Sequence, residues 1–270
     1  MVALAGISVL VGFLGSLIGL GGAAIIIPIL VLIGVPVKEA IASAMITIIA
    51  TSSGSASSYV RQRIANIKIA MFLEVFTIVG AIAGATITTI INPVFLYFFF
   101  AAFLMTSFLR FRRKRNVVSQ SPDRVSRWLG LGGSYYDESA KKQVSYQADH
   151  AVLGGLGMLI AGIAAGMLGI GAGAFKVTVQ ENVLRLPAKV ASTTSNFIIG
   201  MTALAGLSVY LASGLMNLML MAPIAIGATI GAIIGGRILN RLNDKVLMGL
   251  FFAVVTYLIV QMLYEVVLAL

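Results

Sequence analysis

The chain contains no cysteine, one tryptophan and one histidine, and it is poor in charge. The lack of cysteine excludes disulfide bonds, thiolate nucleophiles and cysteine metal sites. Charged residues make up only 10% of the 270 residues, whereas a soluble globular domain carries about 25%. Hydrophobic residues make up 59%, and the mean hydropathy is +1.03. A water-soluble fold is therefore excluded.

The chain contains several long apolar runs. About 20 apolar residues cross a ~30 Å hydrocarbon core as a helix, whereas strands of a membrane β-barrel alternate in polarity. The run at residues 67–91 does not alternate, so we predict an all-α, polytopic protein of the cell (inner) membrane. Residues 1–20 have no basic n-region, so we expect them to belong to the fold. The apolar stretches are residues 2–33, 40–59, 67–91, 94–109, 152–183, 190–212, 215–238 and 246–267.

The chain repeats itself at a nearly constant offset. Pro36 matches Pro187, Gly80-Ala-Ile-Ala-Gly84 matches Gly231-Ala-Ile-Ile-Gly235, and Asn92 matches Asn243, all 151 positions apart. The glycine-rich breaks Leu17-Ile-Gly-Leu-Gly-Gly22 and Met167-Leu-Gly-Ile-Gly-Ala172 align at an offset of 150. We therefore predict two halves with one fold, at residues 1–110 and 151–270, joined by a linker at 111–150.

The basic residues set the expected orientation. Nine of the nineteen lie between Arg110 and Lys142, so the positive-inside rule places the 110–150 loop in the cytoplasm. The remaining charges fit this rule only if each glycine-split stretch enters the membrane and returns to the same side. Each half then has a hairpin of two short helices plus three crossing helices, the repeats are inverted and both termini lie outside. We also expect the basic loop to contact anionic lipid.

Glycines at the two hairpin tips are the first candidate site residues. Glycine in a helix costs about 1 kcal/mol relative to alanine, and a break at membrane depth is tolerated only inside protein or beside water. Inverted-repeat transporters bind substrate at such breaks, with helix N-termini facing anions; close helix packing is the alternative role. The tip candidates are Gly19, Gly21, Gly22, Gly169, Gly171 and Gly173.

Two charges within apolar stretches are further candidates, because a charge at membrane depth marks a functional site by default. Lys176 follows the second tip and can neutralise an anion, pair with Glu181, or extend to an interface. Glu74 can carry a coupling ion, either a proton or sodium, or pair with Arg61 or Arg63.

Hydroxyl and amide side chains near the breaks offer neutral donors to an oxyanion. The candidates are Ser43 in the first half and Thr194, Ser195 and Asn196 in the second. Such side chains also bond to their own helix backbone, which is their ordinary role in membrane helices. The lone histidine, His150, is expected at a solvated interface.

The chain resembles the TauE/SafE family of sulfite and organosulfur-anion exporters, also called the sulfonate-uptake permease family. The resemblance rests on Gly12-Phe-Leu-Gly-Ser-Leu-Ile-Gly-Leu-Gly-Gly22, on Val35-Pro-Val-Lys-Glu-Ala40, on Gly80-Ala-Ile-Ala-Gly84-Ala and on Lys189-Val-Ala-Ser-Thr-Thr-Ser195. The family's Thr-Ser pair stands as Thr194-Ser195 in the second half, while the first half has Ser43-Ala44. The resemblance implies secondary transport of small sulfur-containing or carboxylate anions.

We therefore expect a transporter of anions such as sulfite or sulfoacetate that works by alternating access around a midplane site. The alternatives are an anion channel and a non-transporting membrane subunit. An intramembrane enzyme is disfavoured because the chain has no cysteine, one histidine and no intramembrane carboxylate pair. We expect no cofactor, no metal site and no nucleic-acid partner.

Overall fold

The computed structural model describes residues 2–18, 21–61, 65–92, 94–96, 98–99, 123–137, 141–239 and 256. These residues are mostly helical, and four helical segments among them are long and apolar enough to cross a membrane. They are Ile67–Ile90, Ala151–Leu168, Ala188–Ala212 and Leu218–Gly235. The prediction of a mostly helical chain with several spans is confirmed. Most residues of the predicted spans at 94–109 and 246–267 lie outside the described residues.

Each half of the chain contains the same order of helices: one helix, a short break, a short helix and two long helices. In the first half these are α1 (Val2–Ile18), α2 (Ala23–Leu32), α3 (Val37–Arg61) and α4 (Ile67–Ile90). In the second half they are α7 (Ala151–Leu168), α8 (Gly173–Asn182), α9 (Ala188–Ala212) and α10 (Leu218–Leu239). Pro36 and Pro187 directly precede α3 and α9, where a fixed φ favours starting a helix.

The linker contains a small sheet, which corrects the all-α prediction. After α6 (Arg124–Trp128), strand β1 (Gly132–Asp137) pairs antiparallel with β2 (Lys142–Gln147). Tyr135, Val144 and Tyr146 favour strands because their side chains pack well on a pleated surface, and the rings of Tyr135 and Tyr146 lie 6.3 Å apart. This short segment has no long apolar run, so hydropathy alone did not reveal it.

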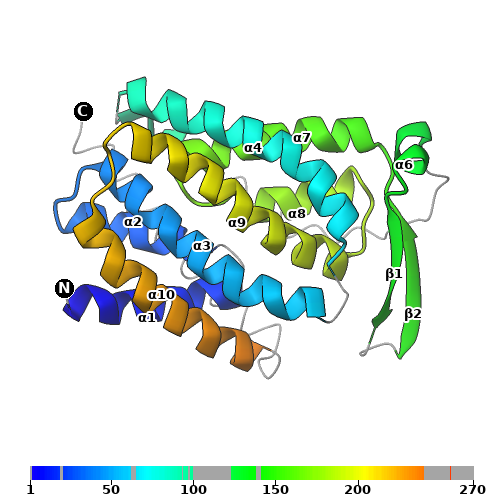
Figure 1. Cartoon of the computed structure of the whole chain (residues 1–270), viewed down its shortest axis with the longest axis horizontal. Helices are drawn as coiled ribbons and strands as arrows, with labels where there is room; N and C mark the ends of the chain where they lie inside the picture. The colour runs from blue at the N-terminus through cyan, green and yellow to red at the C-terminus, as the bar shows by residue number, and fades with distance from the viewer. Residues whose placement is uncertain are drawn as a thin grey trace.

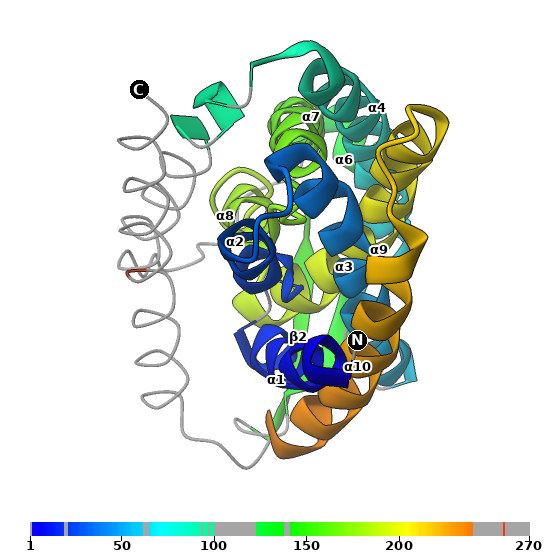
Figure 2. The ribbon, with the colours of Figure 1, turned by 90° about the vertical axis from the view of Figure 1, so that its left-hand side faces the viewer.

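The long helices lie roughly along one axis of the molecule, with β1 and β2 at one end (Figure 1). We call this end the linker end. Helices α1, α3 and α10 run toward it, whereas α4, α7 and α9 run away from it (Figure 1). Helix α4 packs against α7, α1 packs against α10, and α3 packs against α9. Figure 2 shows the α4–α7 and α1–α10 pairs on opposite sides of the bundle.

The glycines of the repeated Gly-Ala-Ile motif bring the paired helices together. A methyl group added at Gly80 of α4 would lie 2.2 Å from the carbonyl oxygen of Leu159 in α7. A methyl group at Gly231 of α10 would lie 2.0 Å from the carbonyl oxygen of Val9 in α1. Both distances are far inside van der Waals contact, so only glycine permits these approaches. Small residues have this role in membrane helix packing.

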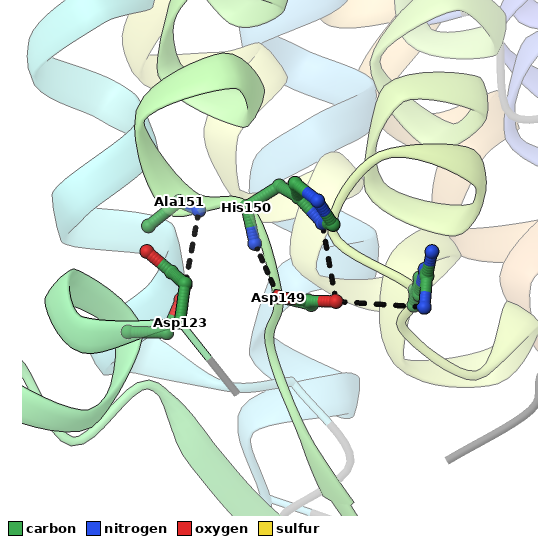
Figure 3. Close-up of polar contacts among 6 residues, drawn as sticks. Asp123, Asp149, His150 and Ala151 are labelled. Carbon is green, nitrogen blue, oxygen red and sulfur yellow. Dashed lines mark hydrogen bonds and ion pairs between the residues drawn. The ribbon is translucent and has the colours of Figure 1, made fainter. Parts of the chain in front are cut away.

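The base of the second hairpin is tied at the linker end. The Asp149 amide donates to the Leu184 carbonyl at 3.0 Å, which closes the hairpin formed by α7 and α8. The Asp149 carboxylate lies 3.1 Å from His150 Nδ1 and 3.5 Å from Arg185. Asp123 accepts from the Ala151 amide at the start of α7 at 3.5 Å (Figure 3). His150 is exposed, as its predicted solvated position requires.

Asp123 is held in its charged form at this helix start. Slight desolvation acts to raise its pKa, but hydrogen bonds from the Ser126 hydroxyl and from the amides of Ala151, Ser126 and Val125 lower the pKa below its usual value. A negative charge at a helix N-terminus is favourable because the free amides there carry partial positive charge. The linker therefore fixes where the second hairpin begins.

Candidate functional site

Both hairpins turn through residues with positive φ. The first turns at Gly21 and Gly22, each with φ of 73°, and Gly19 lies outside the described residues. The second turns at Gly169, Gly171 and Ala172, with φ of 63°, 71° and 50°. Glycine adopts this region without the Cβ clash that other L-residues incur. The predicted breaks are therefore turns.

Gly173 differs from the other predicted tip residues. It is the first residue of α8 and not part of the turn. Ala172, which directly precedes Gly173, has a positive φ although it is not a glycine.

The two tips pack against the same side chain, Ile48, near the middle of the bundle. A methyl group at Gly21 would lie 3.2 Å from the Ile48 side chain, and one at Gly171 would lie 3.5 Å from the same side chain. On the other side, a methyl group at Gly171 would lie 2.9 Å from Ile199. Ile48 and Ile199 stand near the centres of α3 and α9, each 25 residues long. Ile48 thus separates the two tips.

Both short helices begin at the tips without a side-chain cap. The N-cap of α2 is Gly22 and the N-cap of α8 is Ala172, and neither makes a side-chain cap hydrogen bond. The first amides of a helix have no partner within the helix, and together they carry roughly half a positive charge. Two such ends on either side of Ile48 make this region favourable for a small anion.

Two hydroxyls on α3 are buried without a hydrogen-bond partner among the described residues. They are Ser43 Oγ and Thr47 Oγ1, which lie one turn apart on one face of α3. A methyl group at Gly22 would lie 2.9 Å from Cγ2 of Thr47, so Thr47 adjoins the first tip. One turn after Thr47 on the same face of α3, the Thr51 hydroxyl donates to the Gly21 carbonyl at 3.1 Å. Of the predicted hydroxyls, Ser43 retains free hydrogen-bonding capacity.

The three polar candidates on α9 have different surroundings. Ser195 is buried and lies 3.5 Å from the carbonyl oxygen of Gly173, next to the second tip. Thr194 accepts a hydrogen bond from the Asn66 amide at 3.1 Å, where α4 begins. Asn196 donates to the Ser192 carbonyl of its own helix at 3.2 Å. Only Ser195 of these three adjoins a tip.

Lys176 and Glu74 come together through a threonine. Lys176 is fully buried, and its Nζ donates to Thr202 Oγ1 at 2.8 Å. Thr202 Oγ1 in turn stands 3.4 Å from Oε1 of Glu74, which is 5% exposed. The three side chains come from α8, α9 and α4. Lys176 therefore does not extend to an interface.

The sequence also suggested other partners for Lys176 and Glu74. Lys176 has Thr202 as its hydrogen-bond partner, and the half-buried Glu181 lies further along α8. Arg63 and the side chain of Arg61, the alternative partners of Glu74, lie outside the described residues. Glu74 is thus placed beside Lys176 through Thr202.

Three residues of this region were not found from the sequence. Thr202 is the repeat mate of Thr51, and that correspondence was the available signal. Gln180 follows Lys176 by one turn on α8, is fully buried, and has no partner for either amide atom among the described residues. Asn66 caps α4 through Ile69 and also bonds Gly132 and Tyr146 of the sheet. No local sequence pattern distinguishes Asn66 from other loop residues.

Comparison with known proteins finds a transporter family and two membrane transporters. The family model described as "Sulfite exporter TauE/SafE" matches residues 4–262. The chain is 25% identical to the probable membrane transporter protein YunE of Bacillus subtilis (strain 168), over 96% of both chains. It is 23% identical to the probable membrane transporter protein YdhB of the same organism, over 90% of this chain and 92% of that protein. No solved structure matches the chain.

The match covers nearly the whole chain and confirms the resemblance drawn from the glycine and Pro-x-x-x-Ala motifs. The family consists of membrane transporters and implies a small anionic substrate, so the chain is a multi-pass transporter and not an enzyme. The alternative of a non-transporting subunit is thereby set aside. The protein belongs to the TauE/SafE sulfite exporter family.

Proposed function

We propose that the protein is a secondary transporter of small sulfur-containing anions, such as sulfite and sulfonates like sulfoacetate. One observation carries the proposal: two helix N-termini without side-chain caps lie on either side of Ile48, near the middle of α3, with a buried lysine one turn beyond the second. Helix ends of this kind bind anionic groups in inverted-repeat transporters. The anion site would lie between the two hairpin tips.

We propose further that residues 1–110 and 151–270 form an inverted repeat, which would support transport by alternating access. Repeat mates run in opposite directions: α1 and α7, α3 and α9, and α4 and α10 (Figure 1). The packed helix pairs join the two halves: α4 of the first half packs on α7 of the second, and α10 of the second half packs on α1 of the first. These relations fit a two-fold axis in the membrane plane that passes between the tips. Rocking of one half against the other would expose the site to each side in turn.

The protein would lie in the inner membrane of the cell, with the linker end facing the cytoplasm. Arg124, Arg127, Lys141 and Lys142 belong to this end, and Arg110 to Arg115 lie outside the described residues. Basic residues of short loops remain on the cytoplasmic side, and they attract anionic lipid headgroups. The exposed Trp128 beside Arg127 fits the interfacial position typical of tryptophan.

The polar groups around the tips divide the binding task. Lys176 would balance the charge of the anion, and the free amides of α2 and α8 would donate to its oxygens. Ser43, Thr47 and Ser195 would supply hydroxyl donors. A buried polar group without a partner costs about 1–3 kcal/mol, so an anion that bonds Ser43 and Thr47 would recover that loss. Thr194 and Asn196, already engaged elsewhere, would contribute only indirectly.

The test is anion binding by a variant that lacks the two free hydroxyls. We expect Ser43→Ala/Thr47→Val to fold at least as stably as the wild type, because it removes buried polar groups without partners. We expect its affinity for sulfoacetate, thiosulfate or sulfate to fall about tenfold, as for the loss of one to two hydrogen bonds. Binding is measured by calorimetric titration of detergent-purified protein.

Thr86→Val is the matched control. Thr86 is exposed on α4 and donates to the Ile82 carbonyl of its own helix, so this variant should bind as the wild type does. Unchanged affinity in Ser43→Ala/Thr47→Val would remove these hydroxyls from the site. Flux that saturates with anion concentration in proteoliposomes supports a carrier, whereas flux that rises linearly would indicate an anion channel.

A further inference from the structure

A buried pair of opposite charges adjoins the proposed anion site. Lys176 of α8 donates to Thr202 of α9 at 2.8 Å, and Thr202 Oγ1 lies 3.4 Å from the carboxylate of Glu74 on α4. Lys176 is fully buried and Glu74 is nearly so. A charge in such surroundings persists only with a counter-charge close by, because its desolvation is otherwise too costly. Each of these two groups therefore depends on the other.

Other ionisable groups on the surrounding helices do not take this role. Helix α4 carries Lys68, exposed at its first turn, and α7 carries none. Helix α8 carries Glu181, half-buried near its end, and α9 carries Lys189, exposed at its first turn. Tyr210 of α9 donates its hydroxyl to the Gly166 carbonyl at 2.7 Å. Among the described residues of these helices, Lys176 and Glu74 are thus the two buried opposite charges.

The pair has unused hydrogen-bonding capacity. Oε2 of Glu74 and both amide atoms of Gln180 are buried without a partner among the described residues. An ammonium group has three donors, and Thr202 takes one of those on Lys176. The single hydroxyl hydrogen of Thr202 also has two acceptors, the Ile198 carbonyl at 2.8 Å and Glu74. Buried polar groups are normally satisfied, so this cluster has hydrogen-bonding groups left for a ligand and for a proton.

We propose that Glu74 and the transported anion compete for the ammonium of Lys176, so that each anion binds together with one proton on Glu74. The inference rests on the proposed function and adds its coupling ion. Without anion, ammonium and carboxylate sum to zero charge. When an anion reaches Lys176, the carboxylate loses its counter-charge and takes up a proton from the water that admitted the anion. Release of the anion reverses both steps.

The consequence is cotransport of anion and proton in the same direction. The Gln180 amide, one turn from Lys176 on the same helix face, supplies a further donor to the bound anion. The repeat mates of Lys176, Gln180 and Glu74 are residues that cannot titrate. They are Ile26, Leu30 and Ala225, respectively. The described part of the chain therefore has one such coupling site, and we expect one proton per anion.

The experiment measures protons taken up when anion binds. Purified protein in weakly buffered solution with a pH indicator is titrated with sulfate, thiosulfate or sulfoacetate, which stay ionised at neutral pH. We expect the wild type to take up about one proton per anion bound. Its affinity should also fall about tenfold per pH unit wherever Glu74 is ionised in the free protein. Glu74→Gln, which has the shape of the protonated residue, should bind anion with no proton uptake. Glu181→Gln, the matched control on α8, should behave as the wild type.

The outcomes separate the two proposals. Anion binding by the wild type without proton uptake, or with an affinity independent of pH, would overturn the coupling and leave the anion site intact. Proton uptake that persists in a folded Glu74→Gln protein would also overturn it. If none of the three anions binds to folded wild-type protein, the proposed function fails and the coupling fails with it. The wild-type measurements decide the matter even if Glu74→Gln does not fold.

Discussion

The two hairpins share a backbone course and differ in chemistry. Helix α2 reads Ala-Ala-Ile-Ile-Ile-Pro-Ile-Leu-Val-Leu, whereas α8 reads Gly-Ala-Phe-Lys-Val-Thr-Val-Gln-Glu-Asn. Where the second hairpin has Lys176 and Gln180, the first has Ile26 and Leu30, all four of them fully buried. The duplicated glycines build a symmetric frame, and substitutions on one side of that frame place charge in it.

Helix packing is alike in the two halves, whereas the buried charge of α8 has no counterpart in α2. Packing contacts such as those of Gly80 and Gly231 recur in both halves because both halves need the same helix approach. A second buried lysine would require a second counter-charge and a second desolvation, which a single anion does not need. Beside the first hairpin, α3 instead offers the hydroxyls of Ser43 and Thr47, which have no hydrogen-bond partner among the described residues.

The largest effect on binding is expected from removing the charge of the second hairpin. Lys176→Met should weaken sulfoacetate or thiosulfate binding about 10- to 100-fold, corresponding to the ~1.5–3 kcal/mol of a hydrogen bond to a charged group. Ile26→Met, its repeat mate, should bind as the wild type does, because a swap of similar volume costs less than about 1.5 kcal/mol of stability. Calorimetric titration compares the two. Equal losses would mean that the hairpins contribute alike.

The next effect concerns stability, and here the halves should behave alike. Gly80→Ala and Gly231→Ala each force a methyl group against a facing carbonyl oxygen, at 2.2 and 2.0 Å. Each should lower the free energy of unfolding by about 1–3 kcal/mol, as overpacking does. Gly6→Ala, with nothing within 4 Å of the added methyl group, is the control. Chemical denaturation in detergent measures the two losses of unfolding free energy. A large difference between them would show that the two helix pairs do not depend equally on their glycines.

A smaller effect distinguishes the two turns. Ala172 has φ of 50° where its mate Gly22 has 73°, and an L-residue in this region is strained by roughly 1–2 kcal/mol. Ala172→Gly should therefore raise thermal stability by about 0.5–1 kcal/mol after the added backbone entropy is counted. Gly22→Ala should lower it, since the added methyl group also lies 2.9 Å from Thr47. A destabilised Ala172→Gly protein would argue that the Ala172 methyl group packs productively.

The smallest effect is expected at the bases of the hairpins. Arg185 has φ of 57° and stands where the first half has Gly34 with φ of 87°. Arg185→Gly relieves backbone strain but removes the ion pair with Asp149, and partly exposed pairs contribute about 0–1 kcal/mol. The thermal stability should change by less than about 1 kcal/mol. A loss above about 2 kcal/mol would show that the Asp149 contact carries more than an ordinary surface pair.

Much of the helical frame followed from the sequence. The offset of 151 between Pro36 and Pro187 and the matching glycine breaks predicted the order of helices, and hydropathy predicted their lengths to within a few residues. Local physics dominates here: Pro36, Pro187 and the glycine-rich breaks mark helix boundaries, although Pro28 and Pro223 lie inside helices, and apolar length reflects membrane thickness. The small sheet of the linker escaped because its strands carry no long apolar signal.

The site was less accessible to sequence reasoning. The meeting of Lys176, Thr202 and Glu74 joins three helices, and no spacing along the chain encodes that contact. Thr194 and Asn196 looked as suitable as Ser195, yet one accepts from the Asn66 amide and the other bonds its own helix. Side-chain direction depends on helix rotation within the bundle, which tertiary packing decides.

We propose that an anion binds between the hairpin tips, on the side of the second hairpin. A crystal structure with selenate, whose selenium scatters anomalously, tests it most directly. We expect an anomalous peak next to Nζ of Lys176, between the turns at Gly21 and Gly171, that disappears in Lys176→Met. A peak found solely among the basic residues of the linker, such as Arg124 and Arg127, would contradict the account.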